Sequence, residues 1–479
     1  MLYFNMADHL SFGYASVPPF IGWVAFIVKS LFGYSVFGIR FLPAVLGAIS
    51  ILLMAKMIEN LKGGIAALII ASTAFLISGG FLIFDSLFTP NAFEQFFWLL
   101  IIFLFFKMVR INRPSWWIWI WIVSGFAFLN KYSVIFPLAS LLFFLLLSPH
   151  KKIFRSGYFF VGFAICFLII VPNLVWQGLH GWPVAHHMNE LKQTQLVNLN
   201  YSDFIIDLLS LSSLFTVVWV VGLFSFFFDK EEKSERWLGF SSIFILFSIW
   251  ILRGKAYYVL GLIPFLYVYG AYFMEKHFTG NTAWLNVCIM ALSVIVALIS
   301  LPFSLPVFGF ERLNHYAGKI GHLIIYPFFR WEDGRQHGES QVFADMTGWK
   351  EMTGYVAKAY LQLSPEERQS CTIYAERNYG YAGAVHFYGK AYGLPEPITF
   401  LESYTLWAPD LIPIGPMIYI NTNCDGMSKL FSDIKLIGQV TDPYFREKGL
   451  GVWLCRFPKA ELSTIYQEKA RQEKKLYAQ

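Results

Sequence analysis

The stretch FLNKYSVIFPLASLLFFLLLSP, residues 128–149, places Asn130 and Lys131 at the join of two apolar runs. A helix needs about 20 mostly apolar residues to cross a bilayer. The two runs are either two short spans or one broken helix, and their combined length favours two spans. Apolar segments with short polar joints continue in this way from residue 36 to residue 302. The sequence therefore predicts a mostly α-helical fold, built as a polytopic transmembrane bundle.

The composition supports this class of protein. The chain has 479 residues, of which 56% are hydrophobic and only 14% are charged, whereas soluble proteins carry roughly 25% charged residues. This deficit excludes an ordinary soluble enzyme, a disordered chain and a basic nucleic-acid-binding protein. We predict about ten spans in a transmembrane domain over 36–302: residues 36–56, 65–82, 89–107, 115–130, 132–148, 158–176, 204–228, 237–252, 256–274 and 283–302.

Basic residues mark alternate joints between these spans. The marked joints carry Lys56 and Lys62; Lys107, Arg110 and Arg113; Lys151, Lys152 and Arg155; Lys230, Lys233 and Arg236; and Lys276. Joints rich in Lys and Arg face the cytoplasm. The even number of spans then places both ends of the chain on the extracytoplasmic side.

Two segments outside the bundle have a different character. Residues 1–35 are predicted as an outer loop, in which the apolar helix 19–32 is too short to span and lies along the membrane interface. Residues 303–479 are more polar and predict a small extracytoplasmic α/β domain. Its expected strands are 372–375, 417–421 and 452–457, and its expected helices are 349–362, 381–390 and 459–475.

Ionisable and aromatic residues gather at the joints that are predicted to face outward. Charged groups at membrane depth are costly and mark functional sites, and Lys131, Arg253 and Lys255 are suited to binding a phosphate at the lipid boundary. Each feature also has a structural interpretation, because Trp and Tyr favour membrane interfaces and long basic side chains extend to lipid headgroups. Arg40 is suited to an ion pair with Asp85 or Glu94 at least as well as to a lipid phosphate.

Several of these stretches resemble bacterial membrane glycosyltransferases of the protein O-mannosyltransferase and aminoarabinose-transferase superfamily, which have the GT-C fold. DHLSFGYASVPPF (8–20) resembles the family's first outer loop, and GIRFLPAVLGA (38–48) resembles the start of its following span. Later landmarks of the family are matched in order by FTPNAFEQFFW (88–98), the stretch 128–149, VPNLVWQGLHGWP (171–183) and RGKAYYVLGLIPFLYVYGAYFME (253–275).

The resemblance implies a sugar transferase in the cell inner (cytoplasmic) membrane. The sugar would leave a polyprenyl-phosphate carrier for an acceptor on the extracytoplasmic face. The expected partners are this lipid-linked sugar, membrane lipids and a glycan, lipid or protein acceptor. Under this interpretation the donor phosphate is bound by Lys131, Arg253, Lys255 and Arg40, and the sugar or acceptor is contacted by Asn91, Trp176, Gln177, His180 and Tyr257.

The chain departs from the family at its expected catalytic acid. Relatives carry an Asp-Glu pair just before the residues corresponding to Leu2-Tyr3-Phe4, and Met1 stands here at the Glu position. We therefore expect a late start codon or a truncated chain that lacks the first span. A general base must reach the acceptor proton, and Asp8 and Asp85 are the remaining candidate catalytic carboxylates.

Two alternative functions stay open at this stage. A transporter of lipid-linked substrates would usually show paired inverted repeats with broken helices, and the sequence shows no such repeat. A non-catalytic relative with the same fold is favoured by the departure at the acid pair. No motif requires a cofactor, and a divalent metal is possible, although His180, His186 and His187 lack the fixed spacing of a metal site.

Overall fold

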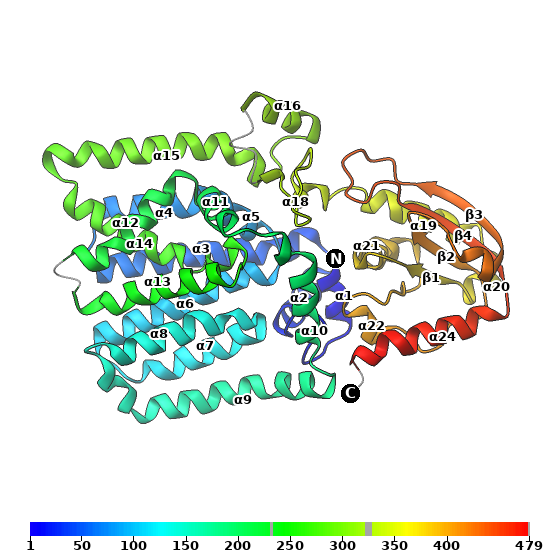
Figure 1. Cartoon of the computed structure of the whole chain (residues 1–479), viewed down its shortest axis with the longest axis horizontal. Helices are drawn as coiled ribbons and strands as arrows, with labels where there is room; N and C mark the ends of the chain where they lie inside the picture. Colours follow the sequence, from blue (N-terminus) through cyan, green and yellow to red (C-terminus); the bar gives the residue numbers. More distant parts are fainter. Residues whose placement is uncertain (230–232, 321–327, 478–479) are drawn as a thin grey trace. The chain divides into compact units, whose positions relative to one another are not determined.

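The computed structural model describes residues 1–229, 233–320 and 328–477 (Figure 1). The chain divides into two compact units. The helical unit comprises Val36–Leu174 and Leu191–Gln336, and the α/β unit comprises Met1–Ser35, Val175–Glu190 and His337–Gln479. Lys230, one of the basic residues predicted to face the cytoplasm, lies outside the described residues.

Helices, most of them apolar, make up the helical unit. In chain order they are α3 (Val36–Asn60), α4 (Ile65–Ile77), α5 (Gly79–Ser86), α6 (Pro90–Ile111), α7 (Trp116–Asn130), α8 (Ile135–Leu147), α9 (Gly157–Leu179), α11 (Tyr201–Ser212), α12 (Thr216–Phe228), α13 (Arg236–Ile251), α14 (Ile263–His277), α15 (Ala283–Ser304) and α16 (Phe310–Ile320). Helix α10 (Pro183–Thr194) links the two units along the chain.

Five helices in the described part of the chain are long and apolar enough to cross a membrane. A sixth span results if α4 and α5, which meet at 61°, form one bent crossing. At Asn130-Lys131 the structure has a break between α7 and α8, because Lys131 is extended (φ −161°, ψ 130°) and a 3-10 turn, Tyr132–Val134, follows it. The chain is therefore a multi-pass membrane protein, and the total of ten spans stays a prediction.

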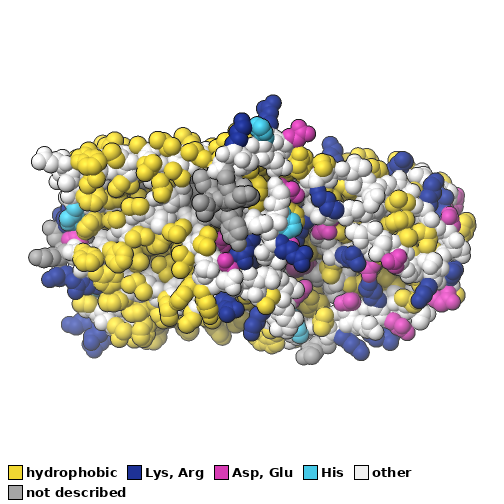
Figure 2. Space-filling view, turned by 45° about the horizontal axis from the view of Figure 1, so that its top comes forward, with side chains coloured by type: hydrophobic (Ala, Val, Ile, Leu, Met, Phe, Trp, Pro, Cys, Tyr) yellow, Lys and Arg dark blue, Asp and Glu magenta, His cyan; other side chains and the backbone are white. Residues whose placement is uncertain are grey.

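Hydrophobic side chains cover the outside of the helical unit, as Figure 2 shows for one face. Phe37, Ile65, Leu168 and Val287 are each about 70% exposed. Soluble proteins rarely expose apolar surface on this scale, whereas a lipid-facing surface requires it. The backbone polar groups are satisfied inside the helices, as they must be in hydrocarbon.

Helices α12 and α14 approach each other closely through two glycines. A Cβ atom on Gly222 would lie 2.0 Å from the backbone oxygen of Leu266, and one on Gly270 would lie 1.9 Å from that of Val218. Small residues at such crossings let two helix backbones come into contact, which is the main packing device available inside a bilayer.

A four-stranded sheet organises the C-terminal part of the α/β unit, in the order β1-β2-β4-β3. The strands are β1 (Thr372–Ala375), β2 (Met417–Asn421), β3 (Phe431–Gln439) and β4 (Gly451–Pro458). β1 and β2 are parallel, and the other two pairs are antiparallel. The strands predicted at 372–375, 417–421 and 452–457 are confirmed, and β3 is an additional strand at the edge of the sheet.

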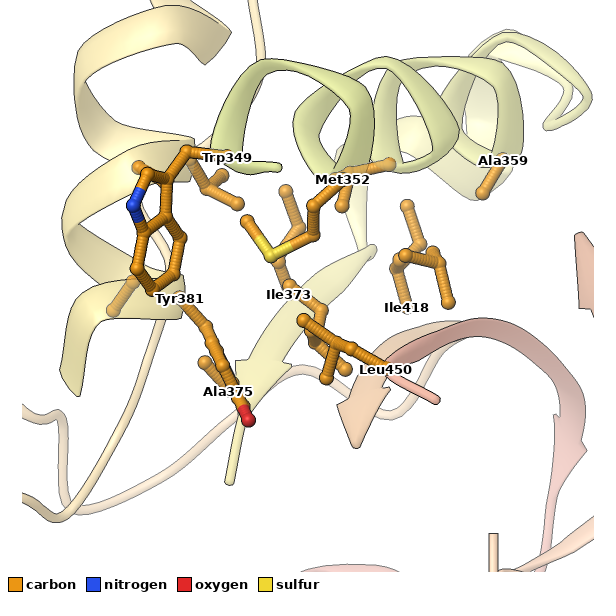
Figure 3. Packing of buried hydrophobic residues seen from close by; sticks show 14 of the residues in the cluster. Trp349, Met352, Ala359, Ile373, Ala375, Tyr381, Ile418 and Leu450 are labelled. Atoms are coloured by element: carbon orange, nitrogen blue, oxygen red, sulfur yellow. The ribbon is translucent and has the colours of Figure 1, made fainter. Parts of the chain in front are cut away.

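Helices cover this sheet and form its main core. They are α18 (Gln341–Ala344), α19 (Trp349–Leu361), α20 (Pro365–Gln369), α21 (Tyr379–Gly389), α22 (Tyr404–Trp407), α23 (Met427–Leu430) and α24 (Glu461–Lys474). Met352 of α19 packs toward Ile373 of β1 and Ile418 of β2 (Figure 3). The fold is thus mostly helical with a small C-terminal mixed sheet, as predicted.

The N-terminal segment belongs to the same compact unit as this sheet. It contains α1 (Leu2–Asp8) and α2 (Phe20–Phe32). The backbone N–H of Ala15 donates to the Ser403 hydroxyl at 3.0 Å, and the Tyr14 hydroxyl donates to the Met6 carbonyl at 2.9 Å. The placement of α2 along a membrane interface stays a prediction.

Candidate functional site

Lys131 is held at the end of α7 by the first turn of α6. The Asn130 side-chain amide donates to the Pro90 carbonyl at 2.9 Å and fixes the end of α7 beside α6. The Lys131 ammonium then donates to the Asn91 amide oxygen at 2.7 Å and to Glu94 Oε2 at 2.6 Å. Asn91 and Glu94 are three residues apart on one helix, so their side chains share a face.

The Glu94 carboxylate is fully engaged. Its side chain is 3% exposed, one oxygen pairs with Lys131, and the other accepts a hydrogen bond from the Ser133 hydroxyl. A buried charge of this kind is tolerated only when it is paired and hydrogen-bonded. Glu94 therefore serves to hold Lys131 in position.

Two tyrosines join Lys131 to a second lysine. The Lys131 ammonium lies 4.0 Å from the ring centroid of Tyr258 and 5.7 Å from that of Tyr257. The Lys255 ammonium lies 5.8 Å from the same Tyr257 ring. Ammonium groups at these distances are attracted to the aromatic faces. We call Lys131, Tyr257, Tyr258 and Lys255 the lysine–tyrosine cluster. Its two lysines place positive charge at the ends of apolar helices.

Lys255 also has polar partners on an earlier and on a later segment of the helical unit. Its ammonium donates to Gln195 Oε1 at 2.6 Å and to Glu332 Oε1 at 2.5 Å. The Lys255 side chain is 10% exposed, whereas that of Glu332 is 40% exposed. The ion pair therefore has a buried cation and an accessible anion.

A small recess opens beside Lys255. Arg253, Asn200, Asp207 and Trp250 line it together with Lys255. Arg253 adopts a left-handed backbone conformation (φ 53°), and its guanidinium lies 4.9 Å from the Tyr201 ring centroid. The structure thus brings Lys255 and Arg253, which were both predicted to bind phosphate, to one concave surface.

Asp85 and Arg40 occupy other parts of the helical unit. Asp85, near the end of α5, accepts a hydrogen bond from the Gln95 side chain and faces Gly47, whose added Cβ would lie 2.5 Å from Asp85 Oδ2. Its neighbour Phe84 contacts Tyr257, with ring centroids 5.2 Å apart. Arg40 is half-buried near the start of α3.

Asp8 belongs to a separate charged group in the α/β unit. Its carboxylate accepts hydrogen bonds from Lys29, from Tyr34, from His386 Nε2 at 2.7 Å and from Lys390 at 3.1 Å. Burial alone would raise the pKa of Asp8, but the hydrogen bonds from Lys29, Tyr34 and Lys390 outweigh it and hold that pKa below its ordinary value. Asp8 is consequently a weak proton acceptor.

The remaining predicted residues also lie in the α/β unit. Trp176 stacks on His180 with ring centroids 4.2 Å apart and covers Gly13, where an added Cβ would lie 2.1 Å from the indole. Gln177 is buried and accepts a hydrogen bond from the Val184 backbone. Across residues 1–229, 233–320 and 328–477, no group of three or more His, Cys, Asp and Glu side chains has a geometry that could hold a metal ion.

Several residues around the lysine–tyrosine cluster and around Asp8 were not predicted as site residues from the sequence. Tyr258 and Ser133 lie within two positions of selected residues in the sequence and contribute to the surroundings of Lys131. Glu332 and His386 lie in the polar part of the chain, far in sequence from their partners Lys255 and Asp8. Only the tertiary structure reveals these two contacts.

Apolar helices that carry a lysine–tyrosine cluster where they end define a polytopic membrane protein with a cationic site. Residues 16–176 match the family model of dolichyl-phosphate-mannose-protein mannosyltransferases. The matched stretch covers about a third of the chain, and it is similar to this family of membrane glycosyltransferases.

Two known proteins are similar to this chain. The crystal structure of ArnT from Cupriavidus metallidurans in the apo state aligns with a TM-score of 0.58 and 16% identity, over 92% of this chain and 88% of that one. This likeness shows a common fold. The lipid A galacturonosyltransferase RgtD of Rhizobium johnstonii is 23% identical over 204 residues, which are 41% of this chain and 42% of that protein. The match thus spans less than half the length of this curated relative.

Proposed function

We propose that the protein transfers a sugar from a polyprenyl-phosphate carrier to an acceptor on the extracytoplasmic side of the cell inner membrane. One observation carries the proposal: two ammonium groups, those of Lys131 and Lys255, contact the same Tyr257 ring in the membrane-spanning unit. Nearby Arg253 lines the recess beside Lys255. A paired cationic site at the boundary of a lipid-facing bundle fits the phosphate of a lipid carrier.

The chemistry of transfer explains why two cations are needed. The acceptor oxygen attacks the anomeric carbon, the bond from that carbon to the phosphate oxygen breaks, and its electron pair leaves with the phosphate. Negative charge therefore grows on the phosphate in the transition state. Preorganised ammonium groups in a site that excludes water stabilise this charge more strongly than water does.

The acceptor must also lose a proton. Of the two acids predicted from the sequence, Asp8 is held by two lysines, and its depressed pKa opposes proton uptake. Asp85 accepts a hydrogen bond from the neutral amide of Gln95, which places no positive charge on it. Asp85 is therefore the better candidate for the base.

The other residues predicted from the sequence are assigned roles within their own units. Asn91 positions Lys131 through their 2.7 Å hydrogen bond, and Arg40 is assigned to the donor phosphate. Tyr257 contacts both ammonium groups, and it stays assigned to the sugar or acceptor. Trp176, Gln177 and His180 belong to the α/β unit, and we assign them to the sugar or acceptor.

Binding of undecaprenyl phosphate in detergent micelles tests the site without knowledge of the sugar. We expect Lys255→Gln to weaken binding at least tenfold, because it removes one of the two cations. Lys276→Gln is the matched control: Lys276 also pairs with a carboxylate, Asp229 at 3.0 Å, and contacts an aromatic ring, Tyr272 at 5.7 Å, but lies outside the cluster. Equal affinity of both variants and the wild type would exclude the proposed donor site.

A further inference from the structure

Helix α2 of the α/β unit has apolar surface on both of its sides. Its buried side is formed by Ile21, Gly22, Ala25 and Val28. On the other side, Phe26, Ile27 and Leu31 share a face by their spacing, and they are between 41% and 71% exposed. A helix that is apolar all round is normally found in a protein core or in a membrane. The exposed face of α2 therefore lacks the polar character that water favours.

The polar side chains of α2 are satisfied without water. Trp23, Lys29 and Ser30 are the residues of this helix whose side chains form hydrogen bonds. The Lys29 ammonium pairs with the Asp8 carboxylate, which neutralises the single charge of the helix inside the unit. The Ser30 hydroxyl donates to the carbonyl four residues earlier at 2.9 Å, and the Trp23 indole N–H donates to the Ser11 carbonyl at 3.0 Å. This arrangement suits contact with lipid, where unpaired charges and unsatisfied polar groups are costly.

The loop that carries Phe12 packs against α2 and adds to its exposed face. The Phe12 ring meets the Trp23 ring edge-on, with centroids 6.1 Å apart, and Phe12 is itself exposed. The next residue, Gly13, is covered by the indole of Trp176, which belongs to α9. Within the α/β unit, this loop therefore connects the exposed face of α2 with the end of α9.

Helix α9 carries an exposed apolar stripe into the α/β unit. Exposed side chains recur on one face of it at helical spacing: Phe160, Phe163, Phe167, Val175 and Leu179. The helix is long and apolar enough to cross a membrane, and its residues from Val175 onward belong to the α/β unit. Trp182, which follows its last turn, is also exposed. The lipid-facing stripe of a spanning helix thus continues onto the α/β unit.

We propose that the α/β unit is anchored in the bilayer by an apolar shelf, which is formed by Phe12, Phe26, Ile27, Leu31, Leu179 and Trp182. The partner of the shelf is lipid: interfacial apolar faces insert about 5–10 Å into the boundary of headgroups and acyl chains, where aromatic rings are favoured. Lipid is favoured over a second protein because the shelf continues the exposed stripe of α9. The sequence predicted an interfacial position for α2 alone, and the structure adds the Phe12 loop, the end of α9 and the internal pairing of Lys29. The anchor does not depend on sugar transfer.

Fluorescence quenching tests the shelf in the full-length protein, reconstituted in phosphatidylcholine nanodiscs. A fluorescent amino acid replaces Leu31, Trp182 or Leu361 in separate variants. Leu361 of α19 is the matched control, because it is an apolar residue of the same unit whose exposure, 62%, lies between those of Leu31 and Trp182. Lipid brominated near the glycerol should quench the probe about twofold at positions 31 and 182, since an inserted face lies within about 5–10 Å of this boundary, but not at position 361. Aqueous iodide should quench in the reverse order.

Other results would overturn the inference. Quenching at positions 31 and 182 by iodide alone would show that the shelf faces water, and protection from both quenchers would show that a protein surface, such as a second copy of this chain, covers it. Equal quenching by lipid at all three positions would remove the shelf as the specific anchor. Stronger quenching by lipid brominated at the chain ends would place these residues deeper than the interface. A variant that lowers the unfolding midpoint is replaced by one with the probe at Phe26 or Leu179, which belong to the same shelf.

Discussion

At the scale of single residues, Lys131 and Lys255 differ in what holds them. Lys131 is paired with a carboxylate that is 3% exposed, whereas the partner of Lys255 is 40% exposed. Removing one member of a buried ion pair leaves the other charge buried and uncompensated, which costs about 3–5 kcal/mol. The two lysines thus carry the same charged group, but removing Lys131 should affect folding more than removing Lys255.

A mutation of Lys131 alone therefore changes both the stability of the protein and its binding of the carrier. We expect Lys131→Met to destabilise the protein by about 3–5 kcal/mol, because Glu94 is left as an unpaired buried charge. The double variant Lys131→Met with Glu94→Gln should recover most of that loss while still failing to bind the carrier. Thermal unfolding in detergent measures the first effect, and undecaprenyl phosphate binding measures the second. Additive stability losses in the double-mutant cycle would contradict the pairing.

Part of this cluster could be predicted from sequence because its residues lie at the ends of apolar runs. Lys131, Asn91, Lys255 and Tyr257 all stand at joints between predicted spans, where a charge or polar group is conspicuous. Glu332 stands in a polar segment in which acids are unremarkable. Its contact with Lys255 depends on how the turn over residues 330–336 packs on the helical unit. No periodicity of the sequence predicts this packing.

At the scale of secondary-structure elements, the buried strands could be predicted from the sequence and the exposed edge strand could not. Strands β1 and β2 are buried along their whole length and read as continuous apolar runs. Strand β3, FSDIKLIGQ, lies at the edge of the sheet and is mostly exposed, so its sequence lacks that signal. Among the helices, the break at Lys131 was predicted, whereas the contact between α12 and α14 depends on two glycines in separate apolar runs.

The crossing of α12 and α14 is the element contact most sensitive to a single methyl group. We expect Gly270→Ala to destabilise the helical unit by about 1–3 kcal/mol, since the new Cβ would meet the Val218 carbonyl and force the helices apart. Gly157→Ala on α9 is the control, because nothing lies within 4 Å of its Cβ position. Thermal unfolding of both variants in detergent should separate them. Equal midpoints would mean that the two backbones are not in contact.

At the scale of the whole molecule, the chain has two compact units with different sources of stability. The helical unit is a bundle with an apolar outer surface, and its buried acids Glu94, Asp203, Asp229 and Glu235 are each paired with a basic residue. The α/β unit has an ordinary apolar core, to which the N-terminal segment adds a charged group around Asp8. Composition predicted the existence of both parts, whereas the union of Met1–Ser35 with the C-terminal sheet depends on contacts between residues nearly 400 positions apart.

The charged group around Asp8 predicts how acid affects the α/β unit. Burial and the nearby Lys390 lower the pKa of His386, although Asp8 and Glu396 oppose this shift. Between the folded pKa and the unfolded value of about 6.5, the unfolded chain binds more protons, so stability falls as the pH falls. The slope for one site is at most about 1.4 kcal/mol per pH unit. Asp8, whose pKa is also lowered, keeps its contribution until the pH falls below about 4.

We therefore expect the α/β unit to lose stability between pH 7 and pH 5.5, and the variant His386→Gln to lose less over the same interval. Hydrogen exchange of peptides covering β2 and β4, corrected for the intrinsic effect of pH on exchange, measures the unit separately from the membrane bundle. His277→Gln, an exposed histidine of the helical unit, should behave as the wild type in these peptides. An identical pH slope in His386→Gln and the wild type would place the acid-sensitive group elsewhere. A reduced slope would show that one buried imidazole couples the N-terminal segment to the stability of the sheet.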